Sequence, residues 1–137
     1  MIQVTKQFRA EIAHRLKDHP GACSNLHGHS YLFEITIAGE PDPKTGMVLD
    51  FKILKDVIEI CIGEWDHALL LEKSDPLIKM LSQYPGKLIQ VPQAPTAEWM
   101  AEATARRLDH SEINVVQVRV WETATSYADW KKEECKC

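Results

Sequence analysis

Two segments near the start of the chain alternate between apolar and polar residues with a period of two. In residues 2–16 the even positions are apolar apart from Lys6, and this row includes His14. A second row begins at His27 and follows the odd positions. A period of two is typical of a strand that buries one face, so the sequence predicts two strands. The Asp-His-Pro-Gly segment at 18–21 separates them.

Two later segments have a helical period. Between residues 54 and 65 the apolar residues recur at i, i+3, i+4, i+7, i+8 and i+11, which indicates one buried stripe of a helix. Asp50 precedes this stripe and is a suitable N-cap. A second helix is expected to begin after Thr96, which can cap it, with Glu98 at the positive end, and to run to about Leu108.

The last third of the chain returns to strand patterns. Valines at positions 116, 118 and 120 predict a third strand, and Glu122 continues their face at its end. A fourth strand is expected around residues 126–130. The order of elements predicts an α+β fold, in which a four-stranded antiparallel sheet has two helices inserted between strands 2 and 3. A chain of 137 residues suits one domain, which we expect to span residues 1–137.

Composition narrows the possible partners. The net charge of −4 argues against a nucleic-acid-binding surface but not against a phosphorylated small molecule. No window approaches the ~18 apolar residues of a membrane span, and the start MIQVTKQFRA lacks the apolar core of a signal peptide. We therefore expect a cytoplasmic protein with no membrane partner. The four cysteines have no regular spacing and should be free thiols or ligands. Cys135 and Cys137 could bind a metal or belong to a solvated tail.

Three histidines form the most informative pattern. His27 and His29 lie two residues apart on the second strand, so their side chains leave the same face of the sheet. His14 ends the apolar row of the first strand and can lie opposite them if the strands form a hairpin. Three neutral imidazoles match Zn²⁺, and three protein ligands leave a fourth position open, as in catalytic sites. The alternative is that each histidine is a hydrogen-bonded core residue, but three at matched positions favour the metal.

Further polar residues allow two interpretations each. Cys23, four residues before His27, is either a fourth zinc ligand or a thiolate beside an open site. Asp66 could orient His67 for proton transfer near neutral pH, or the two could be only a polar helix end. Glu122 is costly to bury unless it is paired. It could bind the two N–H donors of a guanidine-like ring edge, or it could be solvated at the end of its strand.

Six motifs carry a resemblance to a known family. They are AHRL with His14, C-x3-HGHSY from Cys23, GMVLDF at 46–51, DH at 66–67, PTAE at 95–98 and WET with Glu122. In this order they resemble the 6-pyruvoyltetrahydropterin synthase family over nearly the whole chain. The gap of three residues before HGH is most similar to the bacterial branch, the 6-carboxytetrahydropterin synthases of queuosine biosynthesis. One position departs from the family, which usually has asparagine where this chain has Trp99.

The resemblance implies a role for each of these residues. It implies that His14, His27 and His29 bind Zn²⁺, that Cys23, Asp66 and His67 form a catalytic relay, that Glu122 anchors the pterin ring, and that Thr96 and Glu98 help to line its pocket. It also implies the tunnelling fold, in which two stacked trimers form a homohexamer, each trimer closes a barrel of sheets, and the active sites lie at subunit interfaces.

The reaction implied by the resemblance converts 7,8-dihydroneopterin triphosphate and water to 6-carboxy-5,6,7,8-tetrahydropterin, acetaldehyde and triphosphate, which is lyase chemistry. Arg15, beside His14, is a candidate ligand of the triphosphate. The first alternative is 6-pyruvoyltetrahydropterin formation, which eliminates triphosphate without carbon–carbon cleavage. The others are a noncatalytic zinc-stabilised binding module and a metal-free Cys-His-Asp hydrolase.

Overall fold

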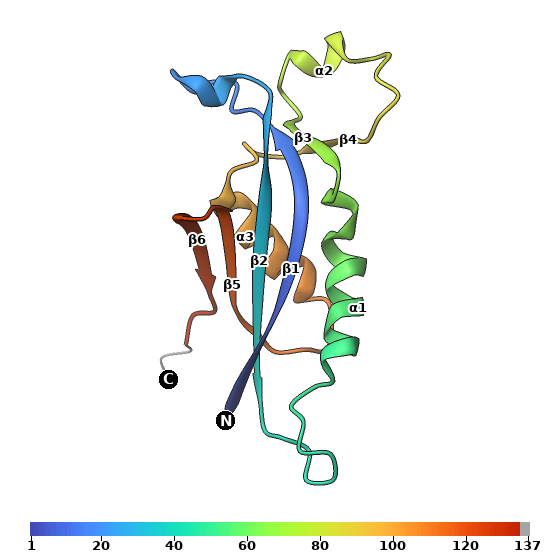
Figure 1. Cartoon of the computed structure of the whole chain (residues 1–137), viewed down its shortest axis with the longest axis vertical. Helices are drawn as coiled ribbons and strands as arrows, with labels where there is room; N and C mark the ends of the chain where they lie inside the picture. Colours follow the sequence, from blue (N-terminus) through green and yellow to red (C-terminus); the bar gives the residue numbers. More distant parts are fainter. Residues whose placement is uncertain (135–137) are drawn as a thin grey trace.

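The computed structural model describes residues 1–134 and is built on a six-stranded mixed sheet of order β4-β3-β1-β2-β5-β6 (Figure 1). The strands are β1 (Ile2–His14), β2 (His27–Gly39), β3 (Ala68–Glu72), β4 (Leu88–Val91), β5 (Val115–Thr123) and β6 (Ser126–Lys131). The helices are α1 (Phe51–Ile62), the short α2 (Leu77–Met80) and α3 (Ala97–Leu108). Two 3-10 turns, η1 (Ala22–Ser24) and η2 (Gly63–Trp65), complete the fold.

The two long strands pair as the alternating rows predict. β1 and β2 form an antiparallel ladder from Ile2↔Gly39 to His14↔His27. β5 pairs with β2 and β6 pairs with β5, both antiparallel. The sequence therefore predicted this four-stranded part of the sheet. Because paired residues of adjacent strands point to the same face, the even positions of β1 and the odd positions of β2 share one side.

The expectation of four strands was wrong, because β3 and β4 extend the sheet beyond β1. β3 pairs in parallel with β1, where Ile12 lies opposite Ala68, and β4 pairs in parallel with β3. Residues 68–71 are buried in a row, so they show no alternation of apolar and polar positions. A strand covered on both faces reads as a continuous apolar run, and a run of this length does not distinguish a strand from a helix end.

The prediction for one core position of β5 was also wrong. The register between β2 and β5 shifts at Thr36/Ile37, so that Ile37 lies opposite Val115. Val115 is buried and Val116 is only half-buried, although the alternation had placed Val116 on the core face. An irregularity of this kind inserts one residue into a strand and reverses the facing of the residues beyond it.

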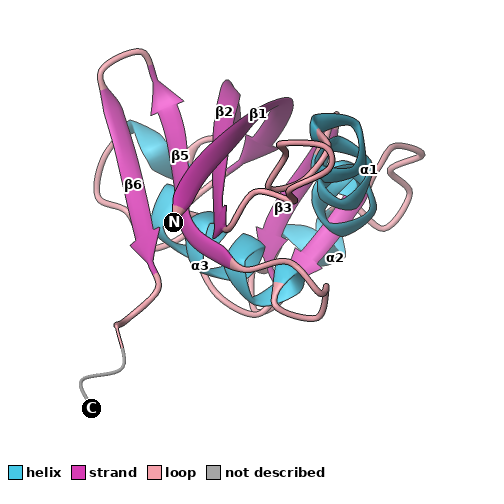
Figure 2. Ribbon diagram, turned by 90° about the horizontal axis from the view of Figure 1, so that it is seen from below, coloured by secondary structure: helices cyan, strands magenta, loops and turns pink. Residues whose placement is uncertain are grey.

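Both predicted helices begin at the predicted caps. Asp50 accepts a hydrogen bond from the backbone N–H of Lys52 (2.8 Å), and Thr96 accepts one from that of Trp99 (3.1 Å). Helices α1 and α3 cover the face of the sheet that carries the even residues of β1 (Figure 2). The opposite face of β1 is polar and exposed. The core therefore lies on one side of the sheet, and the site described below lies at its upper end in Figure 1.

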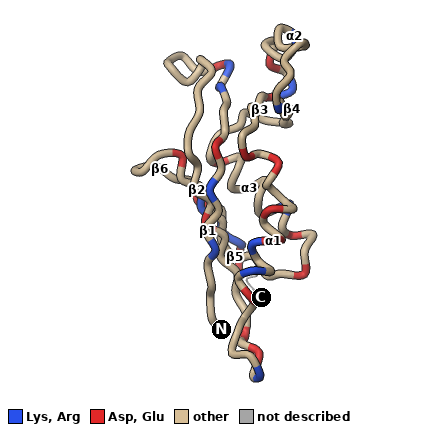
Figure 3. Tube along the Cα trace, turned by 45° about the vertical axis from the view of Figure 1, so that its right-hand side comes forward, with Lys and Arg blue, Asp and Glu red and all other residues tan. Residues whose placement is uncertain are grey.

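Charged residues are distributed along the whole described chain. Lys and Arg positions are interspersed with Asp and Glu positions along the trace (Figure 3). Among residues 1–134 no helix has the length and apolar character needed to cross a membrane. Cys135 and Cys137 lie outside the described residues, so the alternatives for them stay open.

Candidate metal centre and active site

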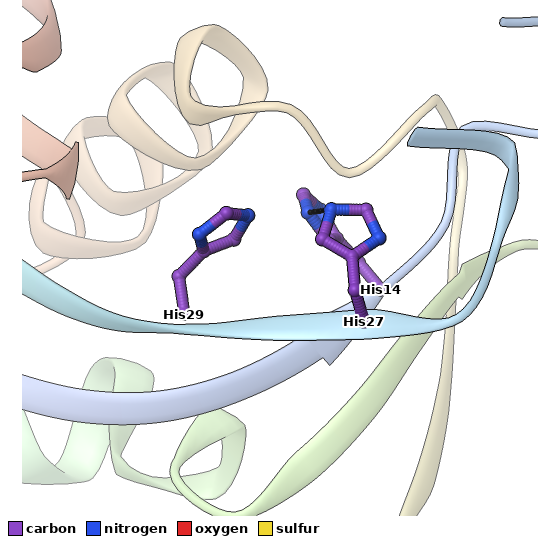
Figure 4. A group of neighbouring side chains, drawn as sticks. All are labelled: His14, His27 and His29. Atoms are coloured by element: carbon purple, nitrogen blue, oxygen red, sulfur yellow. Dashed lines mark hydrogen bonds between the residues drawn. The ribbon is translucent and has the colours of Figure 1, made fainter. Parts of the chain in front are cut away.

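Three imidazoles converge where β1 ends and β2 begins (Figure 4). His14 and His27 are direct cross-strand partners, and His29 follows on the same face of β2. One nitrogen of each ring lies within 4.8 Å of one nitrogen of the other two. The ring centroids are 4.6 Å (His14–His27), 5.3 Å (His14–His29) and 5.0 Å (His27–His29) apart. The strand register alone therefore produces a cluster of a size that suits one metal ion.

The hydrogen bonds of the imidazoles test whether a metal fits. His14 Nδ1 lies 2.7 Å from the carbonyl oxygen of Pro95, and His27 Nδ1 lies 2.7 Å from that of Asn25. A carbonyl only accepts, so each Nδ1–H donates and each Nε2 carries a lone pair. These two Nε2 atoms are 3.1 Å apart, and Nε2 of His29 is buried with no hydrogen-bond partner. Ligating histidines characteristically donate their other N–H in this way, so the cluster fits a zinc ion.

Burial keeps His14 in the form that binds a metal. Its side chain is 1% exposed, and this burial lowers its pKa, as do the neighbouring His27 and His29, against the raising effects of Pro95 and Glu122. A neutral imidazole at physiological pH is the ligand form.

Glu122 lies next to the cluster and faces it. Its Oε1 is 3.5 Å from His29 Nε2, and its Oε2 accepts a hydrogen bond of 3.4 Å from the hydroxyl of Tyr31. The carboxylate also lines a cavity of about 280 Å³ together with Thr96 and Glu98 of the α3 N-terminus. The structure thus brings together the three residues that the resemblance assigned to the pterin pocket, and places their cavity beside the histidines.

Tyr31 is a site residue that the sequence reasoning missed. It was counted only as the apolar residue that follows His29 on the same face of β2. In the structure it is fully buried, and its hydroxyl lies 3.4 Å from both ring nitrogens of His14 as well as from Glu122. Burial, and then the charge of Glu122, raise the pKa of this phenol, so it stays protonated and donates. The sequence feature that could have identified Tyr31 as a site residue is its position two residues after His29, on the same face of β2.

Cys23 lies in η1, on the loop that joins the two strands of the cluster. The residue is half-buried, and its carbonyl accepts a hydrogen bond of 2.8 Å from the backbone N–H of Leu16. Its thiol is not among the ligand atoms that converge with the histidines in the described residues. In the described residues the converging ligand atoms are those of the three histidines alone, which favours the interpretation of Cys23 as a thiol beside the site.

Asp66 and His67 form a pair held against β1. His67 Nδ1 lies 3.0 Å from Asp66 Oδ1, which also accepts a hydrogen bond of 2.8 Å from the backbone N–H of Glu11. His67 donates its own backbone N–H to the carbonyl of Glu11 (2.6 Å) and has a positive φ of 60°. Burial raises the pKa of Asp66, but the bonds from Glu11 and His67, together with Lys87, outweigh it and lower this pKa overall. The carboxylate is therefore ionised and orients the imidazole.

Within a single chain, the Asp66–His67 pair does not lie at the histidine cluster. His67 borders a cavity of about 370 Å³ whose lining includes Ile12 and His29 as well as Glu11, Ala13, Gly28 and Ser30. The last four residues have the opposite strand parity to the histidines, so that part of the lining lies on the other face of the sheet. The side chain of His67 is 76% exposed there. Asp66 and His67 are therefore not part of the cluster that His14, His27 and His29 form in the described residues.

Trp99 lies on α3 and packs against the hydrophobic core. Its ring centroid lies 5.5 Å from that of Trp65, which is itself fully buried. Trp99 borders a second cavity next to Thr96 and Glu98 and is not among the residues that line the cavity of Glu122. Trp99 therefore packs against the core and does not itself line the cavity of Glu122.

Fold and site together define the class: an α+β protein with three histidines that could hold a metal ion, beside a cavity that Glu122 and Glu98 line. The model of the 6-pyruvoyl tetrahydropterin synthase family matches residues 3–133. The 6-carboxy-5,6,7,8-tetrahydropterin synthase of Haemophilus influenzae is 33% identical and covers 96% of this chain and 100% of that protein. The enzyme of the same name from Aquifex aeolicus is also 33% identical, with 96% and 98% covered. The chain belongs to the 6-pyruvoyl tetrahydropterin synthase family, as the motifs predicted.

Solved structures show the same fold at lower identity. An uncharacterized protein of Wolinella succinogenes superposes with a TM-score of 0.80 at 20% identity, covering 96% of this chain and 98% of that one. The 6-pyruvoyl tetrahydropterin synthase of Caenorhabditis elegans gives 0.75 at 24% identity, with 96% of each chain covered. Both likenesses concern the fold alone.

Proposed function

We propose that this chain is a zinc-dependent 6-carboxy-5,6,7,8-tetrahydropterin synthase of queuosine biosynthesis. It would convert 7,8-dihydroneopterin triphosphate and water to 6-carboxy-5,6,7,8-tetrahydropterin, acetaldehyde and triphosphate. One observation carries the proposal: His14, His27 and His29 converge beside Glu122 and its cavity, in a chain that is 33% identical to proteins of that name over nearly its whole length.

Each part of the site has a chemical task in this reaction. His14, His27 and His29 would hold a zinc ion, which would act as a Lewis acid on hydroxyl groups. Glu122 accepts two N–H donors from the ring edge of the pterin, and the hydroxyl of Tyr31 keeps that carboxylate in place. Cys23, as thiolate, moves protons at the side-chain carbons of the substrate, and His67 relays them with Nδ1 held by Asp66. Holding the ring in place keeps the reacting carbons near these groups.

The position of Asp66 and His67 outside the histidine cluster supports a site built from two subunits. His67 would then serve the cluster of a neighbouring copy. The short strand β4 and the strand β6 are the two edges of the sheet, and unpaired edges are places where another chain can add. Both features support the homohexamer of stacked trimers that the family resemblance implies.

A product assay tests this function. Purified protein is incubated with 7,8-dihydroneopterin triphosphate, and acetaldehyde, triphosphate and pterin products are measured with and without a chelator. We expect all three products, loss of turnover with the chelator, and recovery on adding zinc. Triphosphate without acetaldehyde would instead indicate 6-pyruvoyltetrahydropterin formation, as in the protein for which the family is named. Pterin binding without any product would indicate a noncatalytic binding module.

A further inference from the structure

Arg15 connects three parts of the molecule at the metal centre. It directly follows His14 at the end of β1, and its guanidinium donates to both carboxylate oxygens of Asp75, from Nε at 2.7 Å and from Nη2 at 2.6 Å. Its remaining Nη1 donates to the carbonyl of Ser24 at 3.4 Å. All three guanidinium nitrogens therefore have partners within the chain. Three of the five N–H groups of the guanidinium are used in these contacts, so the triphosphate-binding role considered from the sequence stays a prediction.

The carboxylate that holds Arg15 is itself fixed. The side chain of Asp75 is 1% exposed, whereas that of Arg15 is 22% exposed. Asp75 Oδ1 also accepts a hydrogen bond of 2.9 Å from the backbone N–H of Leu77 at the start of α2. Removing one partner of a buried ion pair leaves an uncompensated charge, so this geometry is strongly maintained. Asp75 thus provides a rigid anchor on the segment that follows β3.

Ser24 belongs to the turn that carries the proposed catalytic thiol. Cys23 is the central residue of η1, between Ala22 and Ser24. The turn is bonded to the two residues that follow β1: Leu16 donates its backbone N–H to the carbonyl of Cys23, and Arg15 donates to the carbonyl of Ser24. The next residue, Asn25, provides the carbonyl that orients His27. The position of the thiol relative to the metal centre therefore depends on what holds this turn.

We propose that Arg15, anchored by Asp75, is a positioning residue that holds the Cys23 turn against the three-histidine centre. The inference rests on the proposed function for its catalytic consequence. The guanidinium would act through the turn and touch no substrate. A planar fork can hold a carboxylate with two bonds and still reach a third acceptor, which a lysine ammonium at the same position cannot reproduce.

The chain contains a matched control for the ion pair. Arg119 donates to both oxygens of Asp129, at 2.7 Å and 2.9 Å, across the β5–β6 pair. The pair has the same bidentate geometry, and it lies on β5 and β6, away from the Cys23 turn in the sequence. Arg119→Lys should therefore reproduce the loss of a bidentate ion pair without loosening that turn.

The experiment compares Arg15→Lys with Arg119→Lys by two independent measurements. The first is the alkylation rate of Cys23 by iodoacetamide, resolved by peptide mass spectrometry, with Cys61 on α1 as internal reference. We expect Arg15→Lys to change the Cys23 rate by at least about threefold and to leave Cys61 unchanged, because thiol reactivity depends on local surroundings. Arg119→Lys should leave both rates unchanged. Equal Cys23 rates in wild type and Arg15→Lys would overturn the proposal.

The second measurement is steady-state kinetics with 7,8-dihydroneopterin triphosphate. We expect Arg15→Lys to lower kcat by about tenfold or more with KM and zinc content unchanged, because misplacing a reacting group affects turnover more than binding. Asp75→Asn should act in the same direction, and the double variant should lose no more than the worse single one. Unchanged kcat, or a loss equal to that of Arg119→Lys, would contradict positioning. If the wild type itself shows no turnover, the proposed function fails, and the alkylation measurement still decides the role of Arg15.

Discussion

Glu122 Oε1 lies 3.5 Å from Nε2 of His29, although the two residues are 93 positions apart and belong to different strands. The contact places a carboxylate that can hold a planar ring directly beside a nitrogen that can hold a metal. Both side chains are partly exposed, at 28% for Glu122 and 20% for His29. Glu122 thus connects the histidine cluster with the cavity that it lines.

Zinc content should depend on the histidines of the cluster. Metal analysis of the purified wild type should give about one zinc per chain, and His27→Ala should lose it, because two imidazoles do not make a stable zinc site. His110→Ala removes an exposed histidine elsewhere and should keep full zinc. Full zinc in His27→Ala would show that the metal binds at another place.

Cys23→Ala should separate binding from chemistry. The thiol is outside the converging ligand atoms, so the variant should keep zinc and bind pterin with unchanged affinity. Turnover should fall by about 10²–10⁴-fold, the usual effect of losing a positioned acid or base. The measurements are metal analysis, pterin titration and acetaldehyde production. Loss of zinc in this variant would favour the fourth-ligand interpretation, and wild-type turnover would exclude a catalytic role for the thiol.

Glu122→Gln should weaken pterin binding. The amide keeps the shape of the side chain but loses the charge that strengthens two hydrogen bonds to the ring edge. A hydrogen bond to a charged group contributes about 1.5–3 kcal/mol, so we expect pterin affinity to fall by roughly 10- to 100-fold.

The matched control is Glu34→Gln. Glu34 also lies on a strand and accepts hydrogen bonds from Trp121 and Gln7, but it has the opposite parity to the histidines on β2. Its substitution should leave pterin affinity unchanged in an equilibrium titration. Equal losses in the two variants would mean that Glu122 acts only through stability.

Mixed oligomers should show whether the relay acts between subunits. His27→Ala and His67→Ala should each be inactive, because one lacks a metal ligand and the other lacks the relay imidazole. When the two chains are co-expressed and assemble randomly, about a quarter of the sites between subunits would combine an intact cluster with an intact His67. Activity near a quarter of the wild type is the expected result. A mixture that stays inactive would place the whole relay within one chain.

Asp75 should make stability sensitive to acid. The hydrogen bonds from Arg15 lower the pKa of Asp75 in the folded chain. The unfolded value is about 3.9, so ionised Asp75 stabilises the fold above that pH, and this stabilisation is lost as the pH falls through the folded-state pKa. Asp75→Asn should cost about 2 kcal/mol at neutral pH, because it leaves Arg15 partly buried without its counter-charge.

Denaturant unfolding of metal-free wild type and Asp75→Asn gives the test. The difference between their unfolding free energies should be constant from pH 7 to about 5 and should narrow below about 3.9. Glu102→Gln, which breaks the exposed pair with Arg106, should cost at most about 0.5 kcal/mol. A difference that stays constant throughout the acid range would show that the charge of Asp75 is not what stabilises the fold.

The sequence by itself determined the β1–β2 hairpin, the two main helices and the face on which the histidines lie. These features depend on local spacing: residues two apart on a strand share a face, and an apolar stripe with a 3.6-residue period defines a helix. The parity of His14, His27 and His29 could therefore be read directly. The motifs around them were enough to identify the family.

Only the tertiary structure decided which distant segments meet. The buried run of β3 joined the edge of β1 and left Asp66 and His67 outside the histidine cluster. Folding also placed Asp75 against Arg15, 60 residues earlier in the chain. Local periodicity specifies the facing of a side chain within its own element but contains no information on which other element packs against it. The partners of the site residues therefore became visible only in the folded chain.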